Sequence, residues 1–538
     1  MKSVCSRCIA ISGFLRRSAG DSRHTEWCDG TLRLDWSDII NQPDASTRSF
    51  EPLSPQDASF LAFEHDRCYM HVGVVAIFES TSFRAAGGAL DFEKLERYIL
   101  ARLTGWRRTR QKLARTPLFH RPVWIDDRRF RSEDHIRRAT LDAGAGEDGL
   151  KRLASDIFSH PFDRKKPLWE AALVDGLDDG KFAIVFKTHH AMIDGIAGMD
   201  FVGALLTSDP APGFDDAPLH RAAPPPSRLR LLLNDFTHYA SAPVKLLDGL
   251  RILATDGEAR IDFRDRAYAL AHVIVSGVRG TSPNPLSSYP LPRRTLDWAT
   301  ADASGERAIR ARLGGTRDDV TLAASTGAVR GFLRRRGVRL TRQLRIRAMV
   351  PVNLRTRAER GGTGNRVSTL VVALPVAESE ARVHLERISE TVARLKQVKQ
   401  GLGGDVLAQM DQWTGTMAQS FGIWLAKYRR AYNLCITTIP GSPTALYALE
   451  SKMVALYPLA PVFHKQLFNI AALTYAGTLH WGVHYAGEDA DAAAEFVADL
   501  RQSFAELVEA AAAAPPRIRV VKAEPIGDAD VVRAAVVE

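Results

Sequence analysis

The 538-residue sequence has few cysteines and no long run of apolar residues. Its five cysteines are too few and too scattered for a disulfide scaffold in a chain of this length. No stretch of roughly 18 apolar residues could form a membrane-spanning helix, and the start of the sequence lacks the long apolar core of a signal peptide. These absences predict a cytoplasmic protein, or one bound peripherally to the inner face of a membrane.

Two common catalytic motifs are missing as well. Gly361, Gly362 and Gly364 lack both the spacing of a P-loop and the Lys-Ser/Thr pair that follows one, so nucleotide hydrolysis is not supported. The tetrapeptide 324–327 lacks the first glycine of a nucleophile elbow and lies inside a helical pattern. The sequence therefore offers no convincing motif for a serine or cysteine nucleophile.

Basic residues outnumber acidic ones, 72 to 62, which gives a formal net charge of +10. This balance favours an anionic partner such as coenzyme A, an acidic lipid surface or nucleic acid. A basic stretch at 107–121 is interleaved with Trp106 and Phe119, but no recognised nucleic-acid module surrounds it. We interpret it as a solvated face that could lie near the phosphates of coenzyme A, and expect no nucleic-acid partner.

The chain is longer than one hydrophobic core usually serves, so we expect two packed halves. The predicted organisation is a poorly ordered extension (1–50), an N-terminal half (51–207), a linker with an amphipathic helical region (208–293), a C-terminal half (294–514) and a tail (515–538). In the extension, Cys5, Cys8, His24 and Cys28 have a spacing that a small zinc site could use. Within the linker region, Leu229–Leu253 is amphipathic and suits a core-facing helix or one lying on a membrane, and we favour the core.

The rest of the chain is organised around the stretch Lys181–Pro210. Phe182–Phe186 is a continuous apolar run typical of a strand covered on both faces, and helical spacing of apolar residues resumes after Gly195. His189 and His190 therefore lie at the end of a strand, on a strand-to-helix turn. Successive side chains of a strand point to opposite faces, so one histidine is a candidate reagent and the other a supporting residue.

A neutral histidine can accept a proton at pH 7, which suits a general base acting on a hydroxyl group. Asp194 could orient such a ring, or it could pair with an arginine and stabilise the turn at Gly195; spacing alone does not decide. A metal site is not expected, because adjacent strand residues diverge and no third ligand has suitable spacing nearby.

The sequence His189–Gly195, HHAMIDG, matches the HHxxxDG motif of the CoA-dependent acyltransferase and condensation-domain superfamily. Its neighbours resemble the bacterial wax ester synthase/diacylglycerol acyltransferase family over roughly Glu51–Ala511. The segments that carry the resemblance are Pro52–Leu61, Pro167-Leu168-Trp169, Pro351–Arg355 and Gly364–Ser368.

The resemblance implies an α/β fold of two chloramphenicol-acetyltransferase-like halves, each a mixed sheet with helices, with an active-site tunnel between them. It implies transfer of a long-chain acyl group from acyl-CoA, a co-substrate rather than a cofactor, to diacylglycerol or a long-chain alcohol at a membrane or lipid-droplet surface. His190 would be the general base in a ternary complex. Pro167, Leu168, Trp169, Asn353 and Arg355 would contribute to substrate binding, and either Asn353 or backbone N–H groups near Gly195 would stabilise the oxyanion.

Two positions depart from the family pattern. Asp318 stands where the family has the first residue of an Asn-Asp pair, and Thr438 replaces an asparagine in a turn similar to SNVPGP. Two other functions stay open beside lipid acylation. One is a superfamily acyltransferase that acts on a polyketide or peptide product; the other, suggested only by these departures, is a catalytically silent lipid-binding homologue.

Overall fold

The computed structural model describes residues 49–80, 82–85, 87–103, 106–192, 202–210, 213–215, 222–237, 281–353, 367–400 and 432–515. Contacts divide the chain into two units, 1–48 and 49–538, and all described residues lie in the second. All but the last two residues of the predicted extension, its cysteine cluster and most of the tail therefore lie outside the described residues. Among the described helices, none is long and apolar enough to cross a membrane.

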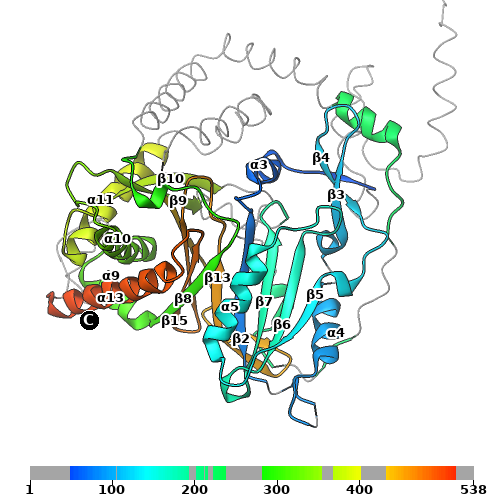
Figure 1. Cartoon of the computed structure of the whole chain (residues 1–538), viewed down its shortest axis with the longest axis horizontal. Helices are drawn as coiled ribbons and strands as arrows, with labels where there is room; N and C mark the ends of the chain where they lie inside the picture. Colours follow the sequence, from blue (N-terminus) through cyan, green and yellow to red (C-terminus); the bar gives the residue numbers. More distant parts are fainter. Residues whose placement is uncertain are drawn as a thin grey trace, which may run out of the picture. The chain divides into compact units, whose positions relative to one another are not determined.

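The first six-stranded sheet holds the histidine motif (Figure 1). Its strand order is β12 (Tyr447–Ala448), β13 (Ser451–Leu459), β2 (His71–Phe78), β7 (Phe182–His189), β6 (Trp169–Asp175) and β5 (Ile136–Thr140). All neighbours pair antiparallel except β5 and β6. Two strands from late in the chain thus complete a sheet that begins at His71.

Helices cover both faces of this sheet. On one face, α4 (Phe92–Leu103) buries Leu95, Tyr98 and Ile99 in one apolar cluster with Phe78 and Phe182. On the other face, α5 (Gly146–Ser159) buries a second stripe against the alternate strand residues. This second cluster also contains Trp298 of β8, so α5 links the first sheet to the second.

The second six-stranded sheet has the order β10 (Val367–Leu374), β9 (Ile346–Asn353), β11 (Leu434–Ile439), β14 (Phe468–Tyr475), β15 (Thr478–Tyr485) and β8 (Thr295–Asp302). The helices α9 (Ala303–Arg312), α10 (Arg317–Arg335), α11 (Ala381–Gln400) and α13 (Ala492–Ala513) gather beside it (Figure 1). Their apolar faces share one core with the strands. The protein is therefore a mixed α/β structure with two sheet-containing halves, as predicted.

A small sheet, β1 (Glu51–Pro52), β4 (Pro122–Asp126) and β3 (Gln111–Arg115), lies outside the two large ones. β1 directly precedes α3 (Pro55–Phe63), and β3 lies within the basic stretch of the sequence. Three cations of that stretch are half-buried in ion pairs: Arg107 with Asp126, Arg108 with Glu51, and Lys112 with Asp127. The interpretation of the whole stretch as a solvated face is therefore wrong for these cations.

A helix at 228–237 packs beside the small sheet. Only Leu231 of its leucines enters a core, where it contacts the cluster of Phe50 and Val123. Leu229, Leu232, Leu233 and Phe236 are exposed. The preference for a core-facing helix is thus wrong for this part, because the apolar stripe faces outward; residues 238–253 lie outside the described residues.

Candidate active site

β7 presents two different faces up to the point where the motif begins. All eight of its residues are buried. Ile184 and Phe186 join the apolar cluster that contains α4 residues, whereas Ala183 and Val185 pack with the α5 residues. Because strand side chains alternate, Lys187 and His189 continue the α5 face.

His189 is locked into the turn that follows β7. Its side chain is 1% exposed, and its Nδ1 accepts a hydrogen bond from the backbone N–H of Ala191 at 3.0 Å. Its carbonyl oxygen accepts from the N–H of Met192 at 2.8 Å. Since Nδ1 is an acceptor, the neutral ring carries its hydrogen on Nε2, which lies 3.4 Å from a carboxylate oxygen of Glu64. His189 is therefore a structural member of the turn.

Glu64 supplies a fixed negative charge beside His189. It follows the last turn of α3, and its carboxylate also accepts a hydrogen bond from Nε of Arg164 at 3.2 Å. Burial acts to raise the pKa of Glu64, but hydrogen bonds and charge from His189 and Arg164 outweigh it and lower the pKa to about 2. Glu64 is thus ionised at neutral pH, and it connects α3 to the motif.

His190 has different neighbours and remains half-buried. Its backbone N–H donates to the carbonyl of Met70 at 2.8 Å. Its imidazole stacks on Phe60 of α3, with ring centroids 3.8 Å apart and planes inclined by 14°. The two histidines therefore diverge, as strand geometry predicts, and α3 orients both of them.

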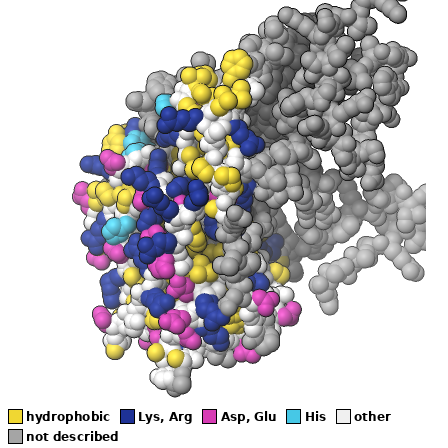
Figure 2. Space-filling view, turned by 90° about the vertical axis from the view of Figure 1, so that its right-hand side faces the viewer, with side chains coloured by type: hydrophobic (Ala, Val, Ile, Leu, Met, Phe, Trp, Pro, Cys, Tyr) yellow, Lys and Arg dark blue, Asp and Glu magenta, His cyan; other side chains and the backbone are white. Residues whose placement is uncertain are grey.

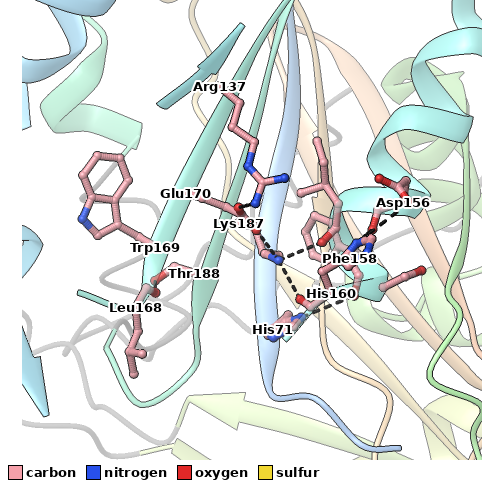
Figure 3. A network of polar contacts seen from close by, with 12 residues as sticks. His71, Arg137, Asp156, Phe158, His160, Leu168, Trp169, Glu170, Lys187 and Thr188 are labelled. Carbon is pink, nitrogen blue, oxygen red and sulfur yellow. Dashed lines mark hydrogen bonds and ion pairs between the residues drawn. The ribbon is translucent and has the colours of Figure 1, made fainter. Parts of the chain in front are cut away.

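A buried ionic network surrounds Lys187, which lies two residues before His189 on the same face of β7 (Figure 3). The side chain of Lys187 is 0% exposed and pairs with Glu170 of β6, whose other oxygen binds Arg137 of β5 at 2.9 Å. The Lys187 ammonium also donates to the carbonyls of Ile157 and His160, at 2.7 and 2.9 Å. These carbonyls terminate α5, where a cation is favoured by the helix dipole. Burial lowers the pKa of Lys187, against the opposing effect of Glu170.

His71 of β2 is another buried polar residue on the face of the sheet that carries Lys187 and His189. It is paired with His189 in the register of β2 and β7, and its Nδ1 lies 3.4 Å from the carbonyl of Phe158. Burial, helped by the nearby charge of Lys187, lowers the pKa of His71 well below its usual value. His71 is therefore a neutral imidazole opposite His189 in the sheet register. Figure 3 shows it within the polar network that includes Lys187 and Phe158.

The Pro167-Leu168-Trp169 segment is hydrogen-bonded to the C-terminal end of β7. The carbonyl of Leu168 accepts from the N–H of His189 at 3.0 Å and from the hydroxyl of Thr188 at 3.1 Å. Trp169 is 1% exposed, donates from Nε1 to the carbonyl of Thr109 at 2.7 Å, and stacks on His135. These contacts give the segment a positioning role, while its predicted role in substrate binding stays a prediction.

A small apolar cavity lies on the other face of β7; its free volume is about 30 Å³, or about 440 Å³ when the open space at its mouth is included. Its lining comes from four neighbouring strands, α4 and the segment after the motif: Val74, Ala76, Phe78, Tyr98, Ile99, Ile184, Phe186, Val202, Leu205, Leu206, Ala448, Met453 and Leu456. Phe186, Thr188 and His190 have the same parity along the chain, so this face of β7 leads toward the second histidine.

Several predicted site residues fall outside the described residues. Asp194, Gly195 and Arg355 are among them, and Asn353 is described only as the last backbone position of β9. The roles predicted for these four residues stay predictions. Within the described part, no three His, Cys, Asp or Glu side chains come together as a metal would require.

The two departures from the family pattern meet each other in space. Thr438 of β11 hydrogen-bonds the carboxyl group of Asp318 in the first turn of α10. Burial raises the pKa of Asp318, partly offset by Lys396 and by this hydrogen bond. Asp319 forms a capping box with Thr316, whose N–H and hydroxyl donate to its carboxylate at 2.7 and 2.9 Å. Asp318 and Thr438 thus differ from the family pattern at one shared contact rather than at two independent positions.

Sequence reasoning missed the residues that orient the histidines: Phe60, Glu64, Met70, His71 and Arg164. All of them are far from His189 in the sequence, so no local spacing could have paired them with it. The one available signal is that Phe60 lies within the Pro52–Leu61 segment, which resembles the family, and that Glu64 comes shortly after it.

Comparisons with known proteins bear on this site. Residues 53–321 match the family model described as the wax ester synthase/diacylglycerol acyltransferase catalytic domain, and residues 363–508 match its C-terminal domain. A candidate diacylglycerol O-acyltransferase of Mycobacterium tuberculosis is 27% identical over 460 residues, which cover 81% of this chain and 86% of the relative. Another, of Mycobacterium bovis, is 28% identical over 443 residues, which cover 80% and 90%.

Solved structures show the same fold. The wax ester synthase/diacylglycerol acyltransferase of Marinobacter aquaeolei superposes with a TM-score of 0.60 at 22% identity, covering 86% of this chain and 100% of that one. The starter condensation domain of rhizomide synthetase, solved with C8-CoA and Leu-SNAC, gives a TM-score of 0.53 at 12% identity, covering 88% and 97%. The chain belongs to the wax ester synthase/diacylglycerol acyltransferase family, whose members carry out lipid acylation in triacylglycerol and wax ester synthesis.

Proposed function

We propose that this protein transfers a long-chain acyl group from acyl-CoA to diacylglycerol, to a long-chain alcohol, or to both, with His190 as the general base. The observation that carries the proposal is the difference between the two histidines. His189 is buried, with one ring nitrogen bonded to Ala191 and the other facing Glu64. His190 is held by its backbone and by stacking, and it stays half-buried at the end of β7.

The reaction follows from the properties of the two substrates. An alcohol is a weak nucleophile, so an unprotonated nitrogen of His190 accepts its proton as the oxygen attacks the thioester carbonyl carbon. The tetrahedral intermediate then collapses, the carbon–sulfur bond breaks, and the imidazolium returns the proton to the CoA thiolate. Both substrates must be bound together, because no acyl group is transferred to the protein.

The apolar cavity supports a long-chain donor. All of its lining side chains come from aliphatic or aromatic residues, and it lies along the strand face that leads to His190. Burying an alkyl chain there would gain roughly 0.8 kcal/mol for each methylene group removed from water. The same cavity offers nothing to the phosphates of CoA, which the net positive charge of the chain would attract instead.

The acceptor also determines where the protein works. Diacylglycerol and long-chain alcohols reside in a bilayer or a lipid droplet, so the enzyme would act from the cytoplasmic surface of one of them. Acyl-CoA and the acceptor lipid are then its partners, and no resident cofactor is required by the chemistry.

The decisive experiment incubates the purified protein with radiolabelled palmitoyl-CoA and either dioleoylglycerol or hexadecanol, and resolves the products by thin-layer chromatography. We expect labelled triacylglycerol or wax ester, formed with one CoA thiol released per ester, and no product from His190→Ala.

Two results would contradict the proposal. Label that stays on the protein after denaturation would indicate a covalent acyl-enzyme. Failure of both lipid acceptors, with acylation of an aminoacyl or polyketide thioester instead, would favour the condensation-type alternative.

A further inference from the structure

Exposed apolar side chains are concentrated in one place. Among the described residues, eight large hydrophobic side chains are exposed, and six of these belong to the tip of the β3–β4 hairpin and to the helix 228–237. The six are Leu118, Phe119, Leu229, Leu232, Leu233 and Phe236; Tyr289 and Val371 are the other two. We call the group of six the apolar tip. Scattered apolar residues are normal on a protein surface, but such a concentration marks an interaction site.

The helix 228–237 is oriented with its apolar stripe toward solvent. Leu229, Leu232, Leu233 and Phe236 have the spacing of one helix face, and Leu229 and Phe236 are 66% and 67% exposed. The opposite, inward face carries Leu231, 8% exposed, and Asp235, 0% exposed. A helix that buries its aspartate and exposes four large apolar side chains is built for an apolar environment outside the protein.

Asp235 fixes the helix to the hairpin. One carboxylate oxygen accepts the backbone N–H groups of Leu118 and Phe119, at 3.3 and 3.2 Å. These bonds hold the hairpin tip against the helix and place both sets of exposed side chains on one surface. The apolar tip is therefore a single structural feature drawn from two distant segments of the chain.

In the two described segments that form the apolar tip, every charged residue other than one buried aspartate is an arginine. The segments 115–121 and 222–237 contain Arg115, Arg121, Arg228 and Arg230, and their only carboxylate is the buried Asp235. Hydrophobic side chains and Lys and Arg side chains occur together at the top of the surface in Figure 2, at the height where Figure 1 places this helix and hairpin.

We propose that the apolar tip is the docking surface of this protein for an anionic phospholipid membrane. Apolar side chains would enter the boundary between headgroups and acyl chains while the arginines contact anionic headgroups, as in interfacial helices. A second copy of this chain would bring the same arginines together and repel, whereas an anionic lipid surface complements them. The inference rests on the proposed function, since a lipid acceptor must be collected from such a surface.

The test is flotation of the full-length protein with vesicles of phosphatidylcholine alone, or with phosphatidylglycerol added. The variant Leu229→Ser/Leu233→Ser/Phe236→Ser removes three exposed side chains, and Tyr289→Ser/Val371→Ser is the matched control. We expect the control and the wild type to float with the anionic vesicles, and the triple variant to lose at least tenfold in binding. Arg228→Gln should weaken binding less, and about 1 M NaCl, which shortens the Debye length to roughly 3 Å, should weaken binding of the wild type.

Activity provides an independent measurement. Acylation of diacylglycerol in anionic vesicles should fall with binding in the triple variant, while acylation of a short, water-soluble alcohol should equal that of the wild type. Equal flotation of all variants would overturn the proposal. So would a lipid-free dimer, detected by light scattering, that the triple variant converts to monomers, because a second copy would then cover the apolar tip. Vesicle binding without any acyl transfer would instead refute the proposed function and leave the docking surface standing.

Discussion

The two faces of β7 differ in chemistry although their residues alternate one by one along the strand. The face toward α5 carries Lys187 and His189, both buried and both tied to carboxylates. The opposite face carries Ile184 and Phe186, which line an apolar cavity. One face is filled and fixed by charge, and the other leaves space.

The charged face of β7 therefore supports the site, and the opposite face leaves space for the proposed substrate. Burying charged groups is costly unless they are paired, so a strand that carries them must be held in one register. A fixed register determines where His190 emerges at the strand end. The open face can then accept a long apolar group without disturbing the groups that orient the imidazole.

The largest effect should come from His190→Ala. Removing a general base typically lowers the rate by about 10²–10⁴-fold, and because the side chain is half-buried, the melting temperature should change little. Turnover with palmitoyl-CoA and the melting temperature should be measured together, with His189→Ala as the comparison. We expect His189→Ala to lower the melting temperature more than His190→Ala does; near-normal turnover of His190→Ala would refute the proposed mechanism.

The next largest effect should come from replacing Lys187, on the charged face of β7 toward α5. Lys187→Met leaves Glu170 with Arg137 alone and removes the donors to two carbonyls at the end of α5, so unfolding should become easier by roughly 3–5 kcal/mol. The double variant Lys187→Met/Glu170→Gln should recover part of this loss. Lys181→Met, just before β7, removes an exposed ion pair with Asp179 and should change stability by less than roughly 1 kcal/mol in denaturant titrations.

Acid should lower the free energy of unfolding by protonating Glu64, which lies beside His189. Its pKa is about 2 in the folded protein and 4.5 ordinarily, so its contribution is fully present above pH 4.5 and is lost as the pH falls toward 2. The shift corresponds to roughly 3 kcal/mol. Glu64→Gln should therefore flatten the dependence of unfolding free energy on pH in this window, whereas Glu133→Gln, which removes an exposed carboxylate, should not. An unchanged slope in Glu64→Gln would contradict the assigned contacts.

The smallest effect on stability should come from substitutions that add side-chain volume to each face of the first sheet in turn. Ala76→Leu adds atoms beside the cavity and Ala183→Leu adds atoms to the filled α5 face, so each should destabilise by roughly 1–3 kcal/mol, and Ala76→Leu should cost less because the cavity takes up part of the added volume. Only Ala76→Leu should shift the preference from palmitoyl-CoA toward octanoyl-CoA. Equal changes of chain preference in both variants would show that the cavity does not hold the acyl chain.

The sequence was sufficient for elements whose pattern is local. The sequence predicts a helix at Phe92–Leu103 from its apolar spacing and a strand at Val367–Leu374 after a glycine-rich loop, and α4 and β10 have these bounds. The run Phe182–Phe186 predicted a strand covered on both faces, and β7 is buried on both. The turn after the strand could be placed because His189 and His190 come shortly after that run and helical spacing resumes after Gly195.

Other features depend on contacts that no local pattern encodes. Nothing near His189 indicates that Glu64 and Arg164 would meet it, since buried ion pairs depend on the tertiary fold. The stripe of Leu229, Leu232, Leu233 and Phe236 correctly indicates one helix face. Its direction could not be read, because periodicity defines which residues share a face and not whether that face meets a core or a solvent boundary.

The pairing of β13 with β2 has a consequence for how the protein is made. On the ribosome, β2 emerges early, but its partner β13 is synthesised only near the other end of the chain. Until then one edge of β2 has unpaired backbone groups, which is the condition that favours wrong pairing and aggregation. The nascent N-terminal half should therefore depend on chaperones until translation is almost complete. An isolated fragment that ends before β13 should be insoluble, and adding the missing strand as a separate piece should rescue it poorly, because closing such long-range contacts is slow.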